Sequence, residues 1–434
     1  MADRQSTMRI DPETAARIAN DNALWSDFEA ICNCGGRLAG TQSERQAFEL
    51  VERLGRDAAG GIVGQRIGVP YEGWSVVRSS LHLDDGTSAE CYPLLRSTAT
   101  PAQGLNAEVI DLGRGALEDF AAQASDIPGR ITLVRHELMF AAGTIHRGRK
   151  YEMARDYGAV GFLIAGPLEE AIVAGSSGRQ GPEGIPSAGI SPQTAGLLAG
   201  RSTGRASVTL TIETLEAPAE AQNLVFDVPG QSDETVLLSA HLDGHEVSES
   251  AMDNGSGLAV VLAVLRCLAP EMRNFKRGLR VAFFNVEEWA LTGSAHYVGR
   301  LDQRARDSIA LNINLDSVGG SSNLTALTSG FPALGPYLQE VATSNGINLQ
   351  CHLPLMMNSD HANFAAAGIP AFRLVAGFDE PDANLRHVLT PADTRDKVTP
   401  GELHQAVLLT AAIVVAACNA GSEEVTGWRA KTTE

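Results

Sequence analysis

From residue 221 onward, short runs of β-branched and other apolar residues alternate with longer segments whose apolar residues recur at helical spacing. The short runs predict buried strands and the longer segments predict helices. Strands that alternate with helices are typical of an α/β sandwich with a largely parallel, buried sheet. We predict strands at 223–228, 235–243, 279–287, 309–318, 323–328 and 369–376, and helices at 257–269, 292–301, 332–345 and 401–417.

The first half of the chain has a different texture. Residues 11–31 and 42–56 carry apolar residues at helical spacing, and residues 62–84 predict strands. Between 88 and 213, short predicted strands and helices occur without the clustered His, Asp and Glu that follow later. We interpret this block as an inserted domain. The predicted domains are therefore 1–87 and 214–434, which we expect to form one domain together, and the insert at 88–213.

Composition and charge narrow the class of protein. A chain of 434 residues, 44% hydrophobic and 20% charged, is expected to form two or three globular domains. The net charge of −18 argues against nucleic acid and anionic membranes as partners, because both require a basic face. The apolar segment 406–418 is shorter than the roughly 18 residues that span a bilayer, so we expect a core helix. The N-terminal residues lack the apolar region of a secretory signal, which favours a cytoplasmic location.

Metal-type side chains occur where the predicted strands of the second half end. They are His241, Asp243, Asp253, Glu287, Glu288, Asp316 and, in a late loop, His387. Each has an ordinary explanation when it is taken alone: His241 as a hydrogen-bonded core histidine, for example, or Asp253 as a helix cap. Ionised carboxylates beside buried strands are costly unless they are paired or bind a metal, so their repeated occurrence favours a metal site.

The types of side chain indicate which metal. Imidazoles and carboxylates without cysteine suit zinc, with Co²⁺ or Mn²⁺ as substitutes. The six cysteines are scattered along the chain and are expected to be reduced thiols. Two histidines and three carboxylates suffice for two metal ions about 3.5–4 Å apart that share one carboxylate. A further carboxylate then remains as a general base.

The order of these motifs resembles one known family. HLD, DNGSG, VEE, NLD, SDH and a histidine before TPADT occur in the order typical of the di-zinc exopeptidases, which include bacterial aminopeptidases and glutamate carboxypeptidase. The resemblance covers residues 221–420. It implies a three-layer α/β/α sandwich with a mixed, mostly parallel sheet. The block at 88–213 resembles the small, β-rich protease-associated domain inserted in many members, with IPGRITLV, YGAVGFLI and IPSAGIS in the same order.

The resemblance also implies a role for each residue. Asp253 bridges two zinc ions, and a cis peptide bond follows it. One site is completed by His241 and Asp316 and the other by Glu288 and His387. Glu287 is the general base for attack by a metal-bridging water, and Asp243 orients the His241 ring.

The last histidine departs from the family pattern. In the family it commonly follows Tyr and directly precedes Thr, whereas here the run is Arg386-His387-Val388-Leu389-Thr390. The loop is shifted by two residues, and His387 is the histidine that it offers as a ligand. Arg386 stands in place of the Tyr that often holds the oxyanion. It could do the same, bind a substrate carboxylate, or form a surface salt bridge.

One segment of the insert indicates which end of the substrate is held. Residues 145–150 (IHRGRK) resemble the F-R-G-N-K segment of glutamate carboxypeptidase, whose arginine holds the terminal carboxylate of the substrate. The equivalent residue is Arg147. The alternative interpretation is that this basic turn is solvated surface, and the two carry equal weight.

The sequence thus predicts a di-zinc metallopeptidase, an exopeptidase or amidohydrolase of short peptides or N-acyl amino acids. A strict aminopeptidase acting on free N-termini is the alternative within the same class. A non-catalytic receptor or binding homologue is the alternative of another class, and it requires missing ligands. The expected partner is a small peptide or peptide-like substrate, with no nucleic acid and no membrane; a homodimer is left open.

Overall fold

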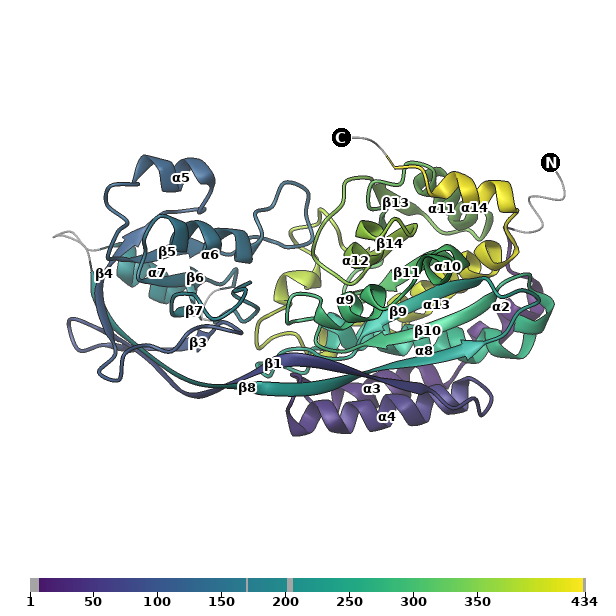
Figure 1. The fold of residues 1–434 in the computed structure, drawn as a ribbon, viewed down its shortest axis with the longest axis horizontal. Helices are drawn as coiled ribbons and strands as arrows, with labels where there is room; N and C mark the ends of the chain where they lie inside the picture. The colour runs from purple at the N-terminus through teal and green to yellow at the C-terminus, as the bar shows by residue number, and fades with distance from the viewer. Residues whose placement is uncertain (1–7, 169–170, 201–205, 432–434) are drawn as a thin grey trace.

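Two bodies joined by a pair of long strands make up the molecule (Figure 1). The computed structural model describes residues 8–168, 171–200 and 206–431. The joining strands are β1 (Gln65–Leu83) and β8 (Ser207–Val228), which pair antiparallel from Gln65–Val225 to Leu83–Val208 with one irregularity between Val76 and Arg78. They extend from the sheet of the larger body into the smaller one.

The larger body is built on a mixed sheet in the order β13-β12-β14-β11-β9-β10-β8-β1. The four central strands, β14, β11, β9 and β10, run parallel to one another. On either side of them, β12 is antiparallel to β14 and β8 is antiparallel to β10. The mixed, mostly parallel sheet predicted from the sequence is confirmed. The strands other than β1 and β8 are β9 (Thr235–His241), β10 (Gly278–Phe284), β11 (Ile309–Leu315), β12 (Leu324–Leu327), β13 (Leu349–His352) and β14 (Ala371–Ala376).

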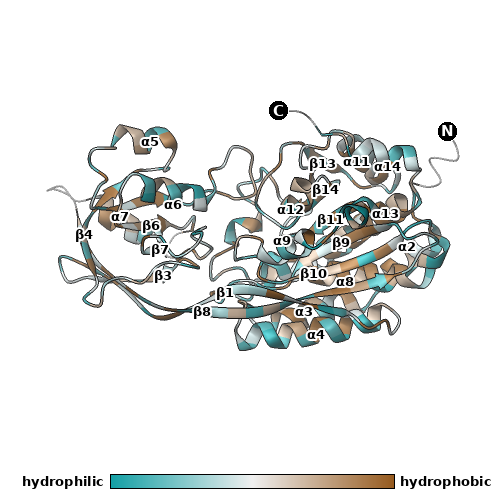
Figure 2. Ribbon diagram, viewed as in Figure 1, coloured by the Kyte–Doolittle hydropathy of each residue, from teal (hydrophilic) through white to brown (hydrophobic). Residues whose placement is uncertain are grey.

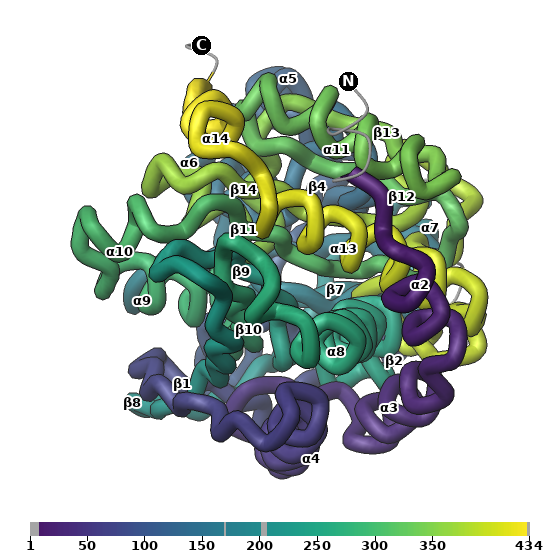
Figure 3. Tube along the Cα trace, turned by 90° about the vertical axis from the view of Figure 1, so that its right-hand side faces the viewer, coloured from purple at the N-terminus to yellow at the C-terminus, as the bar shows by residue number. Residues whose placement is uncertain are grey.

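Helices cover both faces of this sheet, which makes three layers (Figure 3). On one face α8 (Gly257–Leu268) and α13 (Pro400–Asn419) pack on the central strands, and α2, α3 and α4 pack on α8. On the other face lie α9 (Thr292–Gly299), α10 (Gln303–Ser308) and α12 (His361–Ala366). Because both faces are covered, the central strands are buried along almost their whole length, as their continuous apolar runs predict. The remaining elements of this body are α2 (Pro12–Ala19), α3 (Ala23–Cys32), α4 (Gln42–Ala58), η1 (Ala251–Ser256), η2 (Ala269–Asn274), α11 (Leu334–Ser344), η3 (Asn384–His387), η4 (Arg395–Lys397) and α14 (Ser422–Trp428).

All residues of the helix α8 except Arg266 are buried, because other elements enclose the helix. It lies between the sheet and the outer helices, and the brown of α8 and its neighbouring strands in Figure 2 contrasts with the outward face of α4. Two segments, 251–274 and 400–419, are long and apolar enough to span a membrane. Within the protein, 78% and 67% of their most apolar windows are buried, which is typical of core helices. The core helix predicted at 406–418 lies in α13.

The N-terminal helical pattern is interrupted once. The structure divides residues 11–31 into α2 and α3 at Asn20–Asn22, where the main-chain N–H of Asn20 bonds back to Ala16 and ends the first helix. Asp11 caps α2 with its carboxylate, and Thr41 caps α4 through a hydrogen bond from the Glu44 N–H.

The smaller body is the predicted insert. Its sheet continues from β8 in the order β4-β5-β6-β7-β3, with β4, β5, β6 and β7 parallel. The predicted boundary at 213 falls inside β8, because the alternating pattern of a strand does not change where the strand passes from one sheet to another. The elements of the insert and its connections are β2 (Ser88–Ala89), β3 (Cys91–Pro93), β4 (Leu105–Asp111), α5 (Leu117–Ala122), β5 (Ile131–Arg135), α6 (Arg147–Asp156), β6 (Gly161–Ala165), β7 (Ser187–Ile190) and α7 (Pro192–Ala199).

Candidate metal and substrate site

The metal-type side chains lie at one edge of the sheet, at the ends of the neighbouring strands β11, β9 and β10. β9 ends at His241, Asp316 directly follows β11, and β10 ends at Phe284, a few residues before Glu287 and Glu288. Since these strands are parallel, their carboxyl ends meet at the same edge, which is where ligands bind in α/β sheets.

Asp253 reaches this edge from the turn η1, just before α8. The Asp393 carboxylate holds the turn by accepting hydrogen bonds from the main-chain N–H groups of Met252 (2.7 Å) and Asp253 (3.3 Å). The peptide bond between Asp253 and Asn254 is cis, as the family resemblance implies.

His241, Asp253 and Asp316 form a group that suits one metal ion. One ligand atom from each lies within 4.8 Å of the others, and His241 Nε2 is 3.0 Å from Asp253 Oδ1 and 3.6 Å from Asp316 Oδ1. His241 Nε2 and Asp253 Oδ1 are buried and make no well-directed hydrogen bond. Buried polar atoms without partners are costly, so the geometry fits a cation shared by the three side chains.

The groups around His241 and Asp316 orient them for this role. His241 Nδ1 lies 3.0 Å from the main-chain oxygen of Asp243, which leaves Nε2 directed toward the carboxylates. The Asp243 carboxylate is 3.9 Å from that ring, and it instead accepts from the N–H groups of Glu287 and Glu288. Asp243 therefore orients the ring through its carbonyl and holds the glutamate turn with its side chain. Burial opposes ionisation of Asp316, but Arg373, at 3.1 Å, holds the pKa of Asp316 below its usual range.

Glu287 and Glu288 lie in different surroundings although they are neighbours. Burial raises the pKa of Glu287 well above its ordinary value, which His241 opposes and the Glu288 carboxylate reinforces. The Glu288 carboxylate is 2.7 Å from His245 Nε2. Burial opposes the charge of Glu288, yet His245 and Arg147 hold its pKa below the usual range.

The structure does not bring His387 to this group. His387 is the last residue of η3, and the charged groups that act on its imidazole are Arg386, Lys397 and Asp396 rather than the metal carboxylates. Leu389, two residues later, is buried and lines the cavity together with Asp253, Glu287 and Glu288. The ligand role predicted for His387 therefore does not fit the described structure, because His387 is outside the group that converges and, with the two-residue shift of the loop, Leu389 lines the cavity instead.

Arg386 also lies away from the metal group. Its side chain is 41% exposed and pairs with Asp382 at 3.7 Å. It lines a separate small hollow with Leu385 and Val388, not the cavity that contains Asp253 and Glu287. Of the interpretations of Arg386, the structure favours the surface salt bridge.

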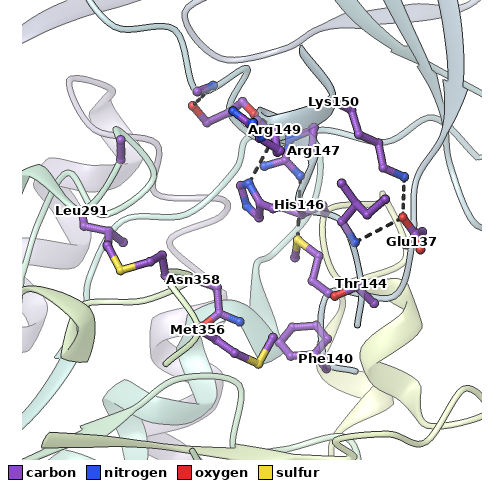
Figure 4. Close-up of a pocket in the computed structure, with 18 of the residues that line it drawn as sticks. Glu137, Phe140, Thr144, His146, Arg147, Arg149, Lys150, Leu291, Met356 and Asn358 are labelled. Carbon is purple, nitrogen blue, oxygen red and sulfur yellow. Dashed lines mark hydrogen bonds and ion pairs between the residues drawn. The ribbon is translucent and has the colours of Figure 1, made fainter. Parts of the chain in front are cut away.

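A cavity of about 820 Å³ opens between the two bodies and ends at the metal group. Its catalytic-domain wall includes Leu291, Met356 and Asn358, and α6 of the insert faces them across the cavity (Figure 4). A volume of this size suits a short peptide or a comparable small molecule.

Arg147, the first residue of α6, brings a buried positive charge to this cavity. Its Nε donates to the Ser176 carbonyl at 2.6 Å, and its guanidinium packs against Gly175 so closely that a Cβ there would lie 2.2 Å from Cζ. Gly175 also has φ +108°, so glycine is required on both grounds. Burial lowers the pKa of Arg147 to about 10, which the Glu288 and Asp253 carboxylates oppose, so the guanidinium stays charged at neutral pH.

Arg147 differs from the other basic residues of its segment in having no carboxylate partner. Lys150 pairs with Glu137 at 2.6 Å and Arg149 pairs with Glu152 at 3.0 Å, whereas among the described residues no carboxylate lies within ion-pair distance of Arg147 (Figure 4). The sequence left open whether this segment binds a substrate carboxylate or is solvated surface. Arg147 is only 5% exposed, so it is not solvated surface.

Comparison with known proteins identifies the family. Residues 223–414 match peptidase family M28 and residues 93–198 match the PA domain. Residues 223–414 thus form a peptidase family M28 domain. As in the family resemblance inferred from the motifs, the PA domain is inserted ahead of the segment that carries the strand-end residues.

Curated relatives span this chain to different extents. Aminopeptidase YwaD of Bacillus subtilis is 26% identical over 389 residues, which are 87% of this chain and 81% of YwaD. Leucine aminopeptidase 2 of Trichophyton equinum is 28% identical over 231 residues, 51% of this chain, and the match covers 43% of the relative.

Solved structures share the fold. The peptidase M28 precursor from Shewanella amazonensis superposes with a TM-score of 0.79 at 21% identity, covering 96% of this chain and 97% of its own. BSAP, a zinc aminopeptidase from Bacillus subtilis, superposes with a TM-score of 0.73 at 24% identity, covering 95% and 97%.

Three residues of this M28 site were not predicted from the sequence. Arg373 lies within the predicted strand at 369–376, whose apolar run gave no hint of a site. Leu389 is apolar and therefore carries no chemical signal of its own, although its place directly before Thr390 is where the family has its histidine. His245 follows HLD closely, but nothing in the sequence joins it to Glu288.

Proposed function

We propose that the chain is a zinc-dependent exopeptidase or amidohydrolase that cleaves an amide bond in short substrates with a free carboxylate, such as dipeptides or N-acyl amino acids. The observation that carries this proposal is the convergence of His241, Asp253 and Asp316 on one point at the end of a cavity that Glu287 and Arg147 also line.

The ligand types indicate the metal. One imidazole and two carboxylates suit zinc, and Co²⁺ or Mn²⁺ can substitute. When bound, zinc supplies a Lewis acid that polarises the scissile carbonyl and lowers the pKa of water. The second ion expected from the sequence is not part of this proposal, because the residues that would hold it do not converge.

The residues of the chain supply the remaining steps. Glu287 accepts a proton from the attacking water and passes it to the leaving nitrogen. Burial favours the protonated form of its carboxyl, which suits the second of these two transfers. Arg147 binds the substrate carboxylate, since a guanidinium and a carboxylate form two parallel hydrogen bonds. Arg373 keeps Asp316 ionised and so preserves its affinity for the cation.

A strict aminopeptidase is the second candidate. It is favoured by the relatives in the family, which are named as aminopeptidases. Such an enzyme must hold a free ammonium group rather than a free carboxylate.

A turnover screen of the zinc-loaded protein distinguishes the two candidates. The substrates are matched dipeptides, of which one is acylated at the N-terminus and the other amidated at the C-terminus. We expect cleavage of the acylated substrate and poor cleavage of the amide. The opposite preference would make the protein an aminopeptidase, and no cleavage of any substrate would refute the proposed activity.

Substitution of Arg147 tests the carboxylate contact directly. We expect Arg147→Ala to lower kcat/KM on the free acid, by an amount that corresponds to about 1.5–3 kcal/mol of activation free energy, the scale of a charged hydrogen bond. On the amide, kcat/KM should change little. The matched control is Arg149→Ala, two residues further along α6, because Arg149 is 65% exposed and paired with Glu152. Equal losses on acid and amide would mean that Arg147 does not bind the carboxylate.

A further inference from the structure

We propose that the site holds a single zinc ion, bound by His241, Asp253 and Asp316, and that the second metal position of the family is absent from this chain. The proposal rests on the proposed metallopeptidase function and concerns the number of ions in the same site. It reverses the expectation of two ions drawn from the sequence.

The first metal position is complete. His241, Asp253 and Asp316 supply three ligand atoms that lie within 4.8 Å of one another. Three protein ligands with one open position are the usual arrangement of a catalytic zinc site. The two carboxylates also balance the two charges of the ion, so no further acidic ligand is needed inside the protein.

The second metal position lacks a converged ligand set. Glu288 is the carboxylate expected there, but Oε2 is hydrogen-bonded to His245 Nε2 at 2.7 Å. Glu288 Oε1 is buried without a partner, as His241 Nε2 and Asp253 Oδ1 are, but it does not share their group of three ligand atoms. In the part of the chain that the structure describes, Glu288 and Asp253 form no group with a third ligand at the spacing that His241, Asp253 and Asp316 achieve.

The imidazole of the second position is also missing. Leu389 lies on the cavity wall beside Asp253 and Glu288, and an alkyl side chain cannot bind a metal. His387 is not among the residues that line this cavity, and the charged groups that act on it are Arg386, Lys397 and Asp396. His245 would have to give up its hydrogen bond to Glu288 before its Nε2 could serve as a substitute.

A fixed positive charge already serves the same region. The buried guanidinium of Arg147 interacts electrostatically with Glu288 and Asp253, the two carboxylates that a second ion would share. A divalent cation placed between these carboxylates would be repelled by Arg147 across an interior that screens charge weakly. Arg147 and His245 together therefore stabilise Glu288 without a second ion.

The number of bound ions tests this inference without measuring activity. The full-length protein is stripped with a chelator and dialysed against zinc in the presence of a weak competing chelator that removes surface-bound ions. Zinc per chain is then measured by mass spectrometry, with calorimetric titration as a second measurement. We expect one zinc per chain for the native protein, none for His241→Ala, and one for both His387→Ala and His245→Ala.

The outcomes separate this inference from the proposed function. Two zinc ions in the native protein, falling to one in His387→Ala or His245→Ala, would overturn the single-ion site and leave the metallopeptidase proposal intact. Absence of zinc from a folded native protein would overturn both. If His241→Ala does not fold, Asp316→Asn replaces it, and that variant is also expected to lose the ion.

Discussion

Glu287 and Glu288 are adjacent in the chain, and the fold assigns them opposite protonation tendencies. Burial favours the protonated form of Glu287, whereas His245 and Arg147 favour the ionised form of Glu288 against the effect of burial. Pairs of carboxyl groups whose surroundings separate their pKa values are typical of acid–base sites. This difference supports the proposed proton-transfer role of Glu287, and it favours a negative charge on Glu288.

If Glu287 transfers the proton, replacing its carboxylate with an amide should lower kcat without removing the metal. We expect Glu287→Gln to lower kcat by about 10²- to 10⁴-fold, the usual contribution of a general base, because the amide cannot carry the proton. Zinc content is expected to stay unchanged, since Glu287 is not among the three ligands. Glu152→Gln, which changes a carboxylate of the cavity wall that is paired with Arg149, is the matched control. Turnover near the native rate in Glu287→Gln would remove Glu287 from the mechanism.

At the scale of elements, α8 shows why the core of this fold is so apolar. It packs between the sheet, α13 and the outer helices α3 and α4, and its N-terminal end continues directly from the turn that carries Asp253. The position of Asp253 thus depends on the packing of α8 as well as on the hydrogen bonds to Asp393. A loosened α8 would weaken both the fold and the metal site.

Truncation of a side chain inside α8 is expected to be costly. Leu262 is 0% exposed, so Leu262→Ala should lower the free energy of unfolding by about 2–5 kcal/mol, through lost burial and the cavity left behind. The comparison is Leu197→Ala in α7 of the insert, where the side chain is 51% exposed and the expected change is within about 0.5 kcal/mol. Both are measured by urea denaturation of the zinc-free protein. Similar values for the two variants would contradict the central place of α8 in the core.

At the scale of the whole molecule, the substrate cavity belongs to neither body alone. The sheet of the larger body supplies the metal group, and the insert supplies Arg147 from α6. The paired strands β1 and β8 set the distance between the two, because both strands extend from the larger body into the smaller one. A change in the curvature of this pair would alter the separation of Arg147 from the metal group.

The three proposed zinc ligands all lie in the larger body. Zinc binding is therefore expected to stabilise the larger body and not the insert. At a free zinc concentration 1,000 times the Kd, binding stabilises the folded state by about 4 kcal/mol. In amide hydrogen exchange, we expect added zinc to slow exchange in β9 and η1, which carry His241 and Asp253, and to leave β5 and β6 of the insert unchanged. The same experiment on His241→Ala serves as the control and should show no effect of zinc. Equal protection of β5 and β6 by zinc would mean that the two bodies unfold as one unit.

The sequence by itself determined the sandwich, the insert and the strand-end residues that converge as a candidate metal group. Each of these depends on a pattern that is local in the chain: apolar strands alternating with helices, and a polar residue at the point where a buried strand ends. Parallel strands then bring His241, Asp316 and Glu287 to the same edge of the sheet, independently of the conformation of the loops.

Only the tertiary structure decided which residues complete the site, because those contacts join segments that no local pattern connects. His387 and Leu389 lie in an irregular loop, where a shift of two residues decides which side chain faces the cavity. Arg147 reaches the cavity from a separate body, and His245 meets Glu288 across 43 residues of sequence. The proposed number of metal ions and the proposed carboxylate substrate rest on these contacts, so they follow from the folded arrangement rather than from any motif.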